Sequence, residues 1–159
     1  MHNIPPNQIT LPAFSVKALE ALSNVIVTAT EGGHYTREDY RKWTDYKHGD
    51  TLMTSMVNGS LVTEKYFRSE VTVYPTKAAL PEDDALIAKD DPRLAPIRLT
   101  PEELGGRLFR RLLDPKMAGH HRAFIARLIA GDEDVAGEMD VVDSGAILQI
   151  AVYGEVVFG

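Results

Sequence analysis

The chain has 159 residues, of which 44% are hydrophobic and 25% are charged; this composition is typical of one compact globular domain and argues against a disordered chain. It contains no cysteine, which excludes disulfide bonds, thiolate metal sites and cysteine nucleophiles, and which suits a reducing compartment. The net charge of −6 argues against bulk electrostatic binding to nucleic acid, because lysine and arginine make most of those contacts.

We expect residues 1–159 to form a single cytoplasmic domain. Residues 1–6 lack the basic start and apolar run of a signal peptide, and no apolar stretch approaches the roughly 20 residues that span a bilayer. The Asn-Gly-Ser sequence at 58–60 matches a glycosylation sequon, but without an export signal it is better interpreted as a turn.

The N-terminal region predicts an arm and a helix. Residues 1–12 are punctuated by proline and predict an extended arm. From residue 15 to about residue 23 the apolar spacing predicts a helix, with these positions on one face: Val16, Leu19, Leu22 and Ile26. Residues 25–30 are rich in β-branched side chains, which favour strands, so helix and strand both remain open there.

Residues 36–49 predict a second helix, with Thr36 and Asp39 resembling an N-terminal cap and Gly49 ending it. Apolar residues then recur at helical spacing, namely Leu52, Met53, Met56 and Val57. The Asn-Gly pair at 58–59 is a strong turn signal.

Alternating residues predict a strand over about 64–74, which Pro75 ends. One side of this strand has Phe67, Ser69, Val71 and Val73. Residues 75–99 then predict a long acidic loop bounded by prolines, with one short helix near 84–88. Loops of this length are uncommon in compact domains and often have a function.

The clearest local signal opens a helix over about 100–114. Thr100 is the predicted N-cap, Pro101 occupies the first helical position, and Glu103 completes a capping box. The inner face of this helix has Leu104, Leu108 and Leu112. Another helix follows and ends before Gly131.

The C-terminal residues predict a β-hairpin over about 138–158. Residues 147–152 form a continuous apolar run that is typical of a buried strand, and residues 139–143 would pair with it. The predicted fold is therefore a single α+β domain, in which a small antiparallel sheet (the strand at about 64–74 and this hairpin) packs with four to five helices.

The adjacent histidines His120 and His121 lie on the helix that ends before Gly131. Neighbouring residues on a helix diverge by about 100°, so the two rings do not suit one metal, whereas helical metal ligands favour a spacing of four. We interpret His121 as a core histidine and His120 as a boundary residue, and expect no metal site.

Arg107, Arg110 and Arg111 predict a basic strip on the outer face of the helix at 100–114. Such a strip in an acidic protein could hold an anionic ligand or nucleic acid. The alternative, which we favour, is that neighbouring acidic segments neutralise it or that it is a solvated helix face.

A catalytic alternative rests on His34, which follows two glycines and has Asp39 nearby. A small hydrolase or transferase would require His34, Asp39 and His120 to converge on one pocket. The sequence contains no Walker loop, G-x-G-x-x-G, G-x-S-x-G or EF-hand motif, so we expect no cofactor and lean against an enzyme. Trp43, with nearby tyrosines, predicts either an interface or a core cluster.

The leading functional hypothesis is a small non-catalytic binding or regulatory module that acts by protein–protein contact, a class that includes inhibitors and adaptors encoded by mobile elements. Its expected contact is the acidic loop, through Glu82, Asp83 and Asp84, with a basic protein surface. We also expect a homodimer, because a lone apolar C-terminal strand would need a second copy to cover its edge.

Overall fold

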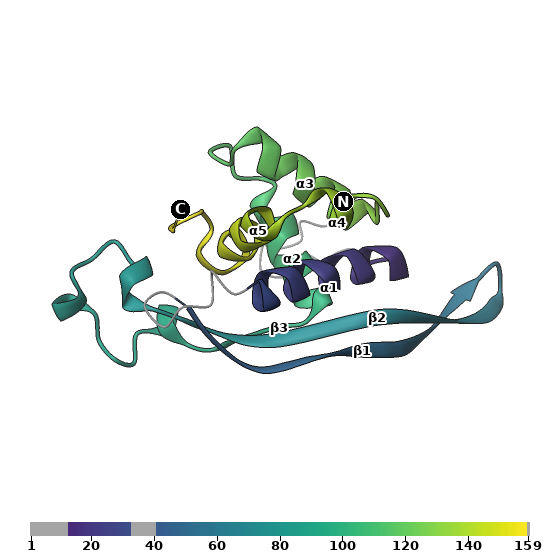
Figure 1. Cartoon of the computed structure of the whole chain (residues 1–159), viewed down its shortest axis with the longest axis horizontal. Helices are drawn as coiled ribbons and strands as arrows, with labels where there is room; N and C mark the ends of the chain where they lie inside the picture. Colours follow the sequence, from purple (N-terminus) through teal and green to yellow (C-terminus); the bar gives the residue numbers. More distant parts are fainter. Residues whose placement is uncertain (1–12, 33–40, 159) are drawn as a thin grey trace, which may run out of the picture.

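The computed structural model describes residues 13–32 and 41–158. It confirms an α+β fold in a single compact domain, in which a three-stranded antiparallel sheet of order β1-β2-β3 lies under a layer of helices (Figure 1). The predicted arm at 1–12 and the predicted cap at Thr36 lie outside the described residues.

Helix α1, Val16–Glu31, confirms the predicted N-terminal helix and extends it through 25–30. Its first turn is capped by the Ser15 hydroxyl, which accepts a hydrogen bond from the backbone N–H of Ala18 (3.1 Å). Val25 and Ile26 are buried in the core, and this burial outweighs the weak strand preference of β-branched side chains.

The helix predicted over 36–49 is wrong for every position that the structure describes. Strand β1, Arg41–Val57, pairs antiparallel with β2, Ser60–Pro75, and together they form a long hairpin. Asn58 (φ 51°) and Gly59 (φ 80°) form the turn, as predicted, and their positive φ angles fit a type I′ turn. Pairing with β2, which the apolar spacing within β1 does not record, decides the conformation of β1.

The strand predicted at 64–74 is confirmed and lies within β2, which begins four residues earlier. The short strand β3, Ile97–Leu99, pairs with the other edge of β2. The segment between β2 and β3 has three single turns of 3-10 helix: η2 (Lys77–Ala79), η3 (Asp84–Leu86) and η4 (Pro92–Leu94). Ile87 is the buried side chain between η3 and η4.

The two helices predicted after residue 100 are confirmed as α2, Pro101–Arg111, and α3, Gly119–Ala130. Thr100 caps α2 by accepting a hydrogen bond from the N–H of Glu103 (3.1 Å), and Gly131 ends α3 in the left-handed conformation.

The C-terminal hairpin predicted over 138–158 is wrong. The chain forms a short helix α4, Val135–Glu138, and then α5, Val141–Tyr153. Asp140 and Asp143 form a capping box at the start of α5, and Gly154 (φ 86°) ends it. Residues 144–151 are all buried, so α5 is apolar on every side because other elements surround it, not because it is a strand.

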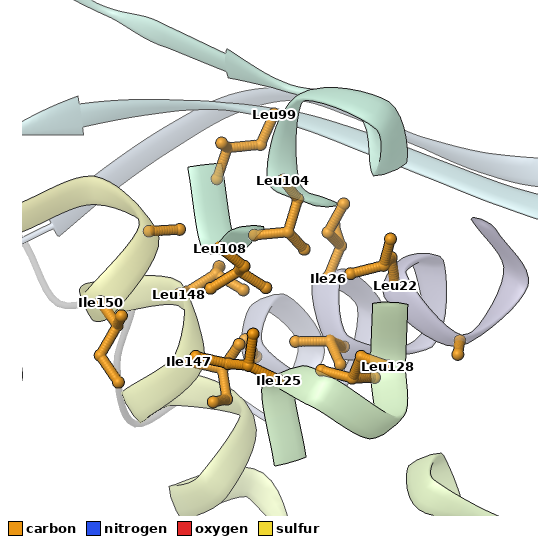
Figure 2. Close-up of a cluster of buried hydrophobic side chains, with 14 of the residues drawn as sticks. Leu22, Ile26, Leu99, Leu104, Leu108, Ile125, Leu128, Ile147, Leu148 and Ile150 are labelled. Carbon is orange, nitrogen blue, oxygen red and sulfur yellow. The ribbon is translucent and has the colours of Figure 1, made fainter. Parts of the chain in front are cut away.

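The core lies where the four longer helices meet the sheet (Figure 2). The side chains labelled in Figure 2 come from five elements: Leu22 and Ile26 of α1, Leu99 of β3, Leu104 and Leu108 of α2, Ile125 and Leu128 of α3, and Ile147, Leu148 and Ile150 of α5. Val71 and Val73 of β2 belong to the same core. The predicted homodimer interface on a C-terminal strand is therefore absent, because those residues are buried within one chain.

Candidate functional site

The far end of the β1–β2 hairpin projects beyond the helices (Figure 1). We call residues 51–65 the hairpin tip. All residues of β2 from Ser60 to Lys65 are exposed, whereas Tyr66 is buried. Closer to the body, helix α1 contacts β2, and the Ser69 hydroxyl donates to the Ser23 carbonyl (2.6 Å).

The hairpin tip concentrates exposed apolar side chains. Among the described residues, five of the ten exposed large hydrophobic side chains lie on it: Leu52 (68% exposed), Met56 (65%), Val57 (48%), Leu61 (74%) and Val62 (36%). A contiguous apolar patch on a protein surface commonly marks an interaction site, whereas scattered single residues do not.

The register of the hairpin divides these five residues between the two sides of the sheet, three on one side and Val57 and Val62 on the other. Met56 pairs with Leu61, so both side chains lie on the same side of the sheet, and Leu52 lies on that side four residues along β1. Thr54 and Thr63 are also paired, and their hydroxyls hydrogen-bond at 2.9 Å. Leu52, Met56 and Leu61 therefore form an apolar face, which includes the threonine pair and is bounded by Lys65, the partner of Leu52.

Trp43 lies on β1 near the body and is 37% exposed. Its ring meets Tyr46 edge to face at 5.8 Å between centroids, and the Tyr46 hydroxyl donates to Glu31 (2.9 Å). Burial and this carboxylate raise the pKa of Tyr46 above its usual value. Trp43 is thus a partly exposed aromatic side chain beside α1, separate from the hairpin tip.

The three predicted arginines have different environments. Arg107 is paired with Glu103 (3.0 Å), whereas no carboxylate of the described residues lies within 4.0 Å of Arg110 or Arg111. Arg110 is exposed, and Arg111 is half-buried against Gly154, where an added Cβ would lie 2.9 Å from a guanidinium nitrogen. The predicted strip is therefore divided, with one residue neutralised and one packed against the end of α5.

Arg111 lines a pocket of about 460 Å³ between α2, α3 and the end of α5. Lys116 and His121 also line it, together with the acidic residues Asp114 and Glu155. His121 is half-buried rather than in the core, and its pKa is lowered by burial and by His120.

His120 is exposed beside His121, and their ring centroids are 3.9 Å apart. Within residues 13–32 and 41–158, no three His, Asp or Glu side chains are grouped as ligands of a metal ion would be. His34 and Asp39 lie outside the described residues, so the convergence of these two residues with His120 stays a prediction.

The acidic loop is partly neutralised within the chain. Arg93 pairs with Glu82 (2.7 Å) and Asp91 (2.8 Å), and these bonds lower the pKa of Glu82 and hold that of Asp91 at about 2. Asp83 caps η3 by accepting a hydrogen bond from the N–H of Ala85 (3.3 Å), and Asp84 is exposed. The loop therefore has fewer free carboxylates than its sequence indicates.

Comparison of the chain with protein-family models, curated proteins and solved structures finds no match. None of the helices in the described part of the chain is both long enough and apolar enough to cross a bilayer.

Sequence reasoning missed Leu52 and Met56, which it placed at helical spacing, and Leu61, to which it gave no role. An available signal was the Asn-Gly turn at 58–59, which favours a hairpin between two strands.

Proposed function

We propose that this protein is a non-catalytic cytoplasmic module that acts by protein–protein contact, and that the hairpin tip is its binding surface. The observation that carries the proposal is the apolar face of Leu52, Met56 and Leu61, each about two thirds exposed or more on a projecting hairpin. Its cytoplasmic placement rests on the cysteine-free sequence, which suits a reducing compartment.

The hairpin differs from an ordinary surface strand in two ways that support binding. Its strands pair without a register shift from Lys47 to Val57 and end in a tight turn, so little ordering is required on binding. Three of its exposed apolar side chains, Leu52, Met56 and Leu61, lie on the same side of the sheet, and their removal from water by a partner lowers the free energy of the complex.

A double substitution of the apolar face tests this function. We expect Met56→Lys with Leu61→Lys to reduce partner recovery at least tenfold, because burying two ammonium groups in an apolar contact is unfavourable. The measurement is affinity capture from a cell lysate with the tagged full chain, in which a bound protein, a second copy of this chain included, is quantified against the bait.

The matched control is Leu86→Lys with Leu113→Lys, which alters two leucines that are 80% and 85% exposed elsewhere on the molecule. The control should retain wild-type recovery. Equal loss in both double variants, or no near-stoichiometric partner for the wild-type chain, would contradict a binding role for the hairpin tip.

The Arg111 pocket supports a second candidate, the binding of a small anionic ligand. A half-buried guanidinium without a carboxylate partner among the described residues lies beside Lys116 and His121, and such an arrangement favours a phosphate or carboxylate group. Asp114 and Glu155 in the same lining oppose it, which makes this candidate weaker than the hairpin.

Thermal unfolding with pyrophosphate as the probe tests the pocket. If the site binds, the wild-type Tm should rise by a few degrees at millimolar pyrophosphate, since a ligand that binds only the folded state stabilises it. Arg111→Ala should abolish the rise, and the exposed neighbour Arg110→Ala should retain it. Equal shifts in all three proteins would show that the anion does not use this pocket.

A further inference from the structure

We infer that the partner of the hairpin tip is a second copy of this chain, and that the two copies pair along the outer edges of their β1 strands around a two-fold axis at Thr54. This inference rests on the proposed function, because it names the partner of the same surface. Among the described residues, strand β1 pairs with β2 alone and is therefore an edge strand.

The open edge of β1 has two parts, which differ in how well they are protected against pairing with another strand. Nearer the body, β1 includes Asp45, Lys47 and Asp50, and an irregular register between Thr44 and Lys47, where Asp45 has φ 54°. Charges and bulges of this kind prevent edges from pairing with other strands. Residues 51–57 (TLMTSMV) contain no charge, proline or glycine, so this part of the edge is open to pairing.

Pairing of two β1 edges requires backbone N–H and C=O groups that point away from β2. In a hairpin with a two-residue turn, the pair that flanks the turn is hydrogen-bonded and alternate pairs are not. Val57 and Ser60 flank this turn, so Leu52, Thr54 and Met56 direct their N–H and C=O groups away from β2. The same alternation directs the N–H of Phe67 away from β1, where the Glu20 carboxylate accepts it (3.0 Å).

Residues 51–57 are self-complementary about Thr54. With antiparallel pairing of two copies around this residue, Thr54 meets the partner's Thr54 and Leu52 meets the partner's Met56. Each of these pairs is made of residues whose backbone groups face outward, so the ladder hydrogen bonds can form. The Leu52, Met56 and Leu61 side chains of both copies would then merge into one apolar face.

The outer edge of β2 does not offer the same match. A two-fold axis at Thr63 would set Leu61 against the partner's Lys65 and Val62 against the partner's Glu64. Both pairs place an apolar side chain against a charged one, which disfavours that edge. The distribution of charged residues therefore favours the edge of β1 over the edge of β2 for pairing between two copies.

Single-cysteine cross-linking of the full chain tests the inference, since the protein has no cysteine of its own. In the proposed dimer the two copies of Thr54→Cys face each other at about 5.5 Å between Cα atoms, within the range of a disulfide. The matched control is Thr63→Cys, which loses the same threonine pair. Its two copies would be about 14 Å apart, three strand spacings, which is too far for a disulfide.

We expect mild oxidation to convert at least ten times more Thr54→Cys than Thr63→Cys into covalent dimer. Light scattering of the wild-type chain should give twice the 17.6 kDa of one copy, and Met56→Lys should shift it to the single-copy mass. A wild-type mass of one copy, unchanged from micromolar to submillimolar concentration, would overturn the inference. So would a dimer in which the two cysteine variants cross-link equally, because that dimer uses another surface.

The outcomes also separate this inference from the proposed function. If the chain is a monomer but the Met56→Lys and Leu61→Lys pair still abolishes capture of a different protein, the inference fails and the proposed function stands. If neither self-association nor hairpin-dependent capture is found, both fail.

Discussion

Leu108→Ala should lower the free energy of unfolding by about 3–5 kcal/mol, because it removes a fully buried side chain and leaves a cavity. Leu108 lies on α2 in the centre of the core, among side chains of α1, α3 and α5 (Figure 2). Since these elements contribute to one core, the cavity affects the whole domain. Urea denaturation followed by circular dichroism measures the change.

Leu113→Ala provides the matched control for Leu108. Leu113 is 85% exposed just beyond α2, so truncating it should change stability by no more than about 0.5 kcal/mol. Equal losses in the two variants would show that the inward face of α2 does not form the core described here.

Gln149→Leu should cost about 2–4 kcal/mol, because it removes a buried hydrogen-bonding group that holds the C-terminal residues. The Gln149 amide accepts from the N–H groups of Val157 (2.9 Å) and Phe158 (2.8 Å), and donates to the carbonyl of Phe158 (3.1 Å). Leucine is of similar size but can make none of these bonds, so the backbone groups of Val157 and Phe158 would lose this partner.

Hydrogen exchange locates the effect of Gln149→Leu. We expect the amides of Val157 and Phe158 to exchange at least tenfold faster, while the amides in the centre of α2 change only with global stability. Val156→Ala, which alters an exposed side chain of the same segment, should leave these amides protected. Unchanged protection in the Gln149 variant would mean that other contacts hold the C-terminal segment.

The elements that sequence reasoning placed correctly share one property: their signals act within a few residues. Thr100 caps its own helix, Gly131 ends one, and Asn58 with Gly59 forms a turn between adjacent residues. Buried and less buried side chains alternate along the strand at 64–74 because one side of it packs on helices. This alternation can be recognised within the strand's own residues.

The C-terminal apolar run, which was incorrectly predicted as a strand, was ambiguous for a physical reason. An apolar run such as 147–152 is compatible with a buried strand or a buried helix, since either conformation removes it from water when it is covered on all sides. Its local signal was the pair Asp140 and Asp143 three residues apart, followed by Gly154, which together bound a helix. The choice between helix and strand at 147–152 depended on tertiary packing, in which α1, α2 and α3 enclose α5.

The sequence by itself determined the α+β class, the caps and turn, the absence of cysteine chemistry and the net acidic charge. Only the tertiary structure decided which apolar residues are covered. Leu52, Met56 and Leu61 have the same apolar character as Leu22 or Leu104, yet they remain exposed because the hairpin extends past the end of α1. Exposure depends on where distant elements end in space, and therefore the candidate site became visible only in the folded chain.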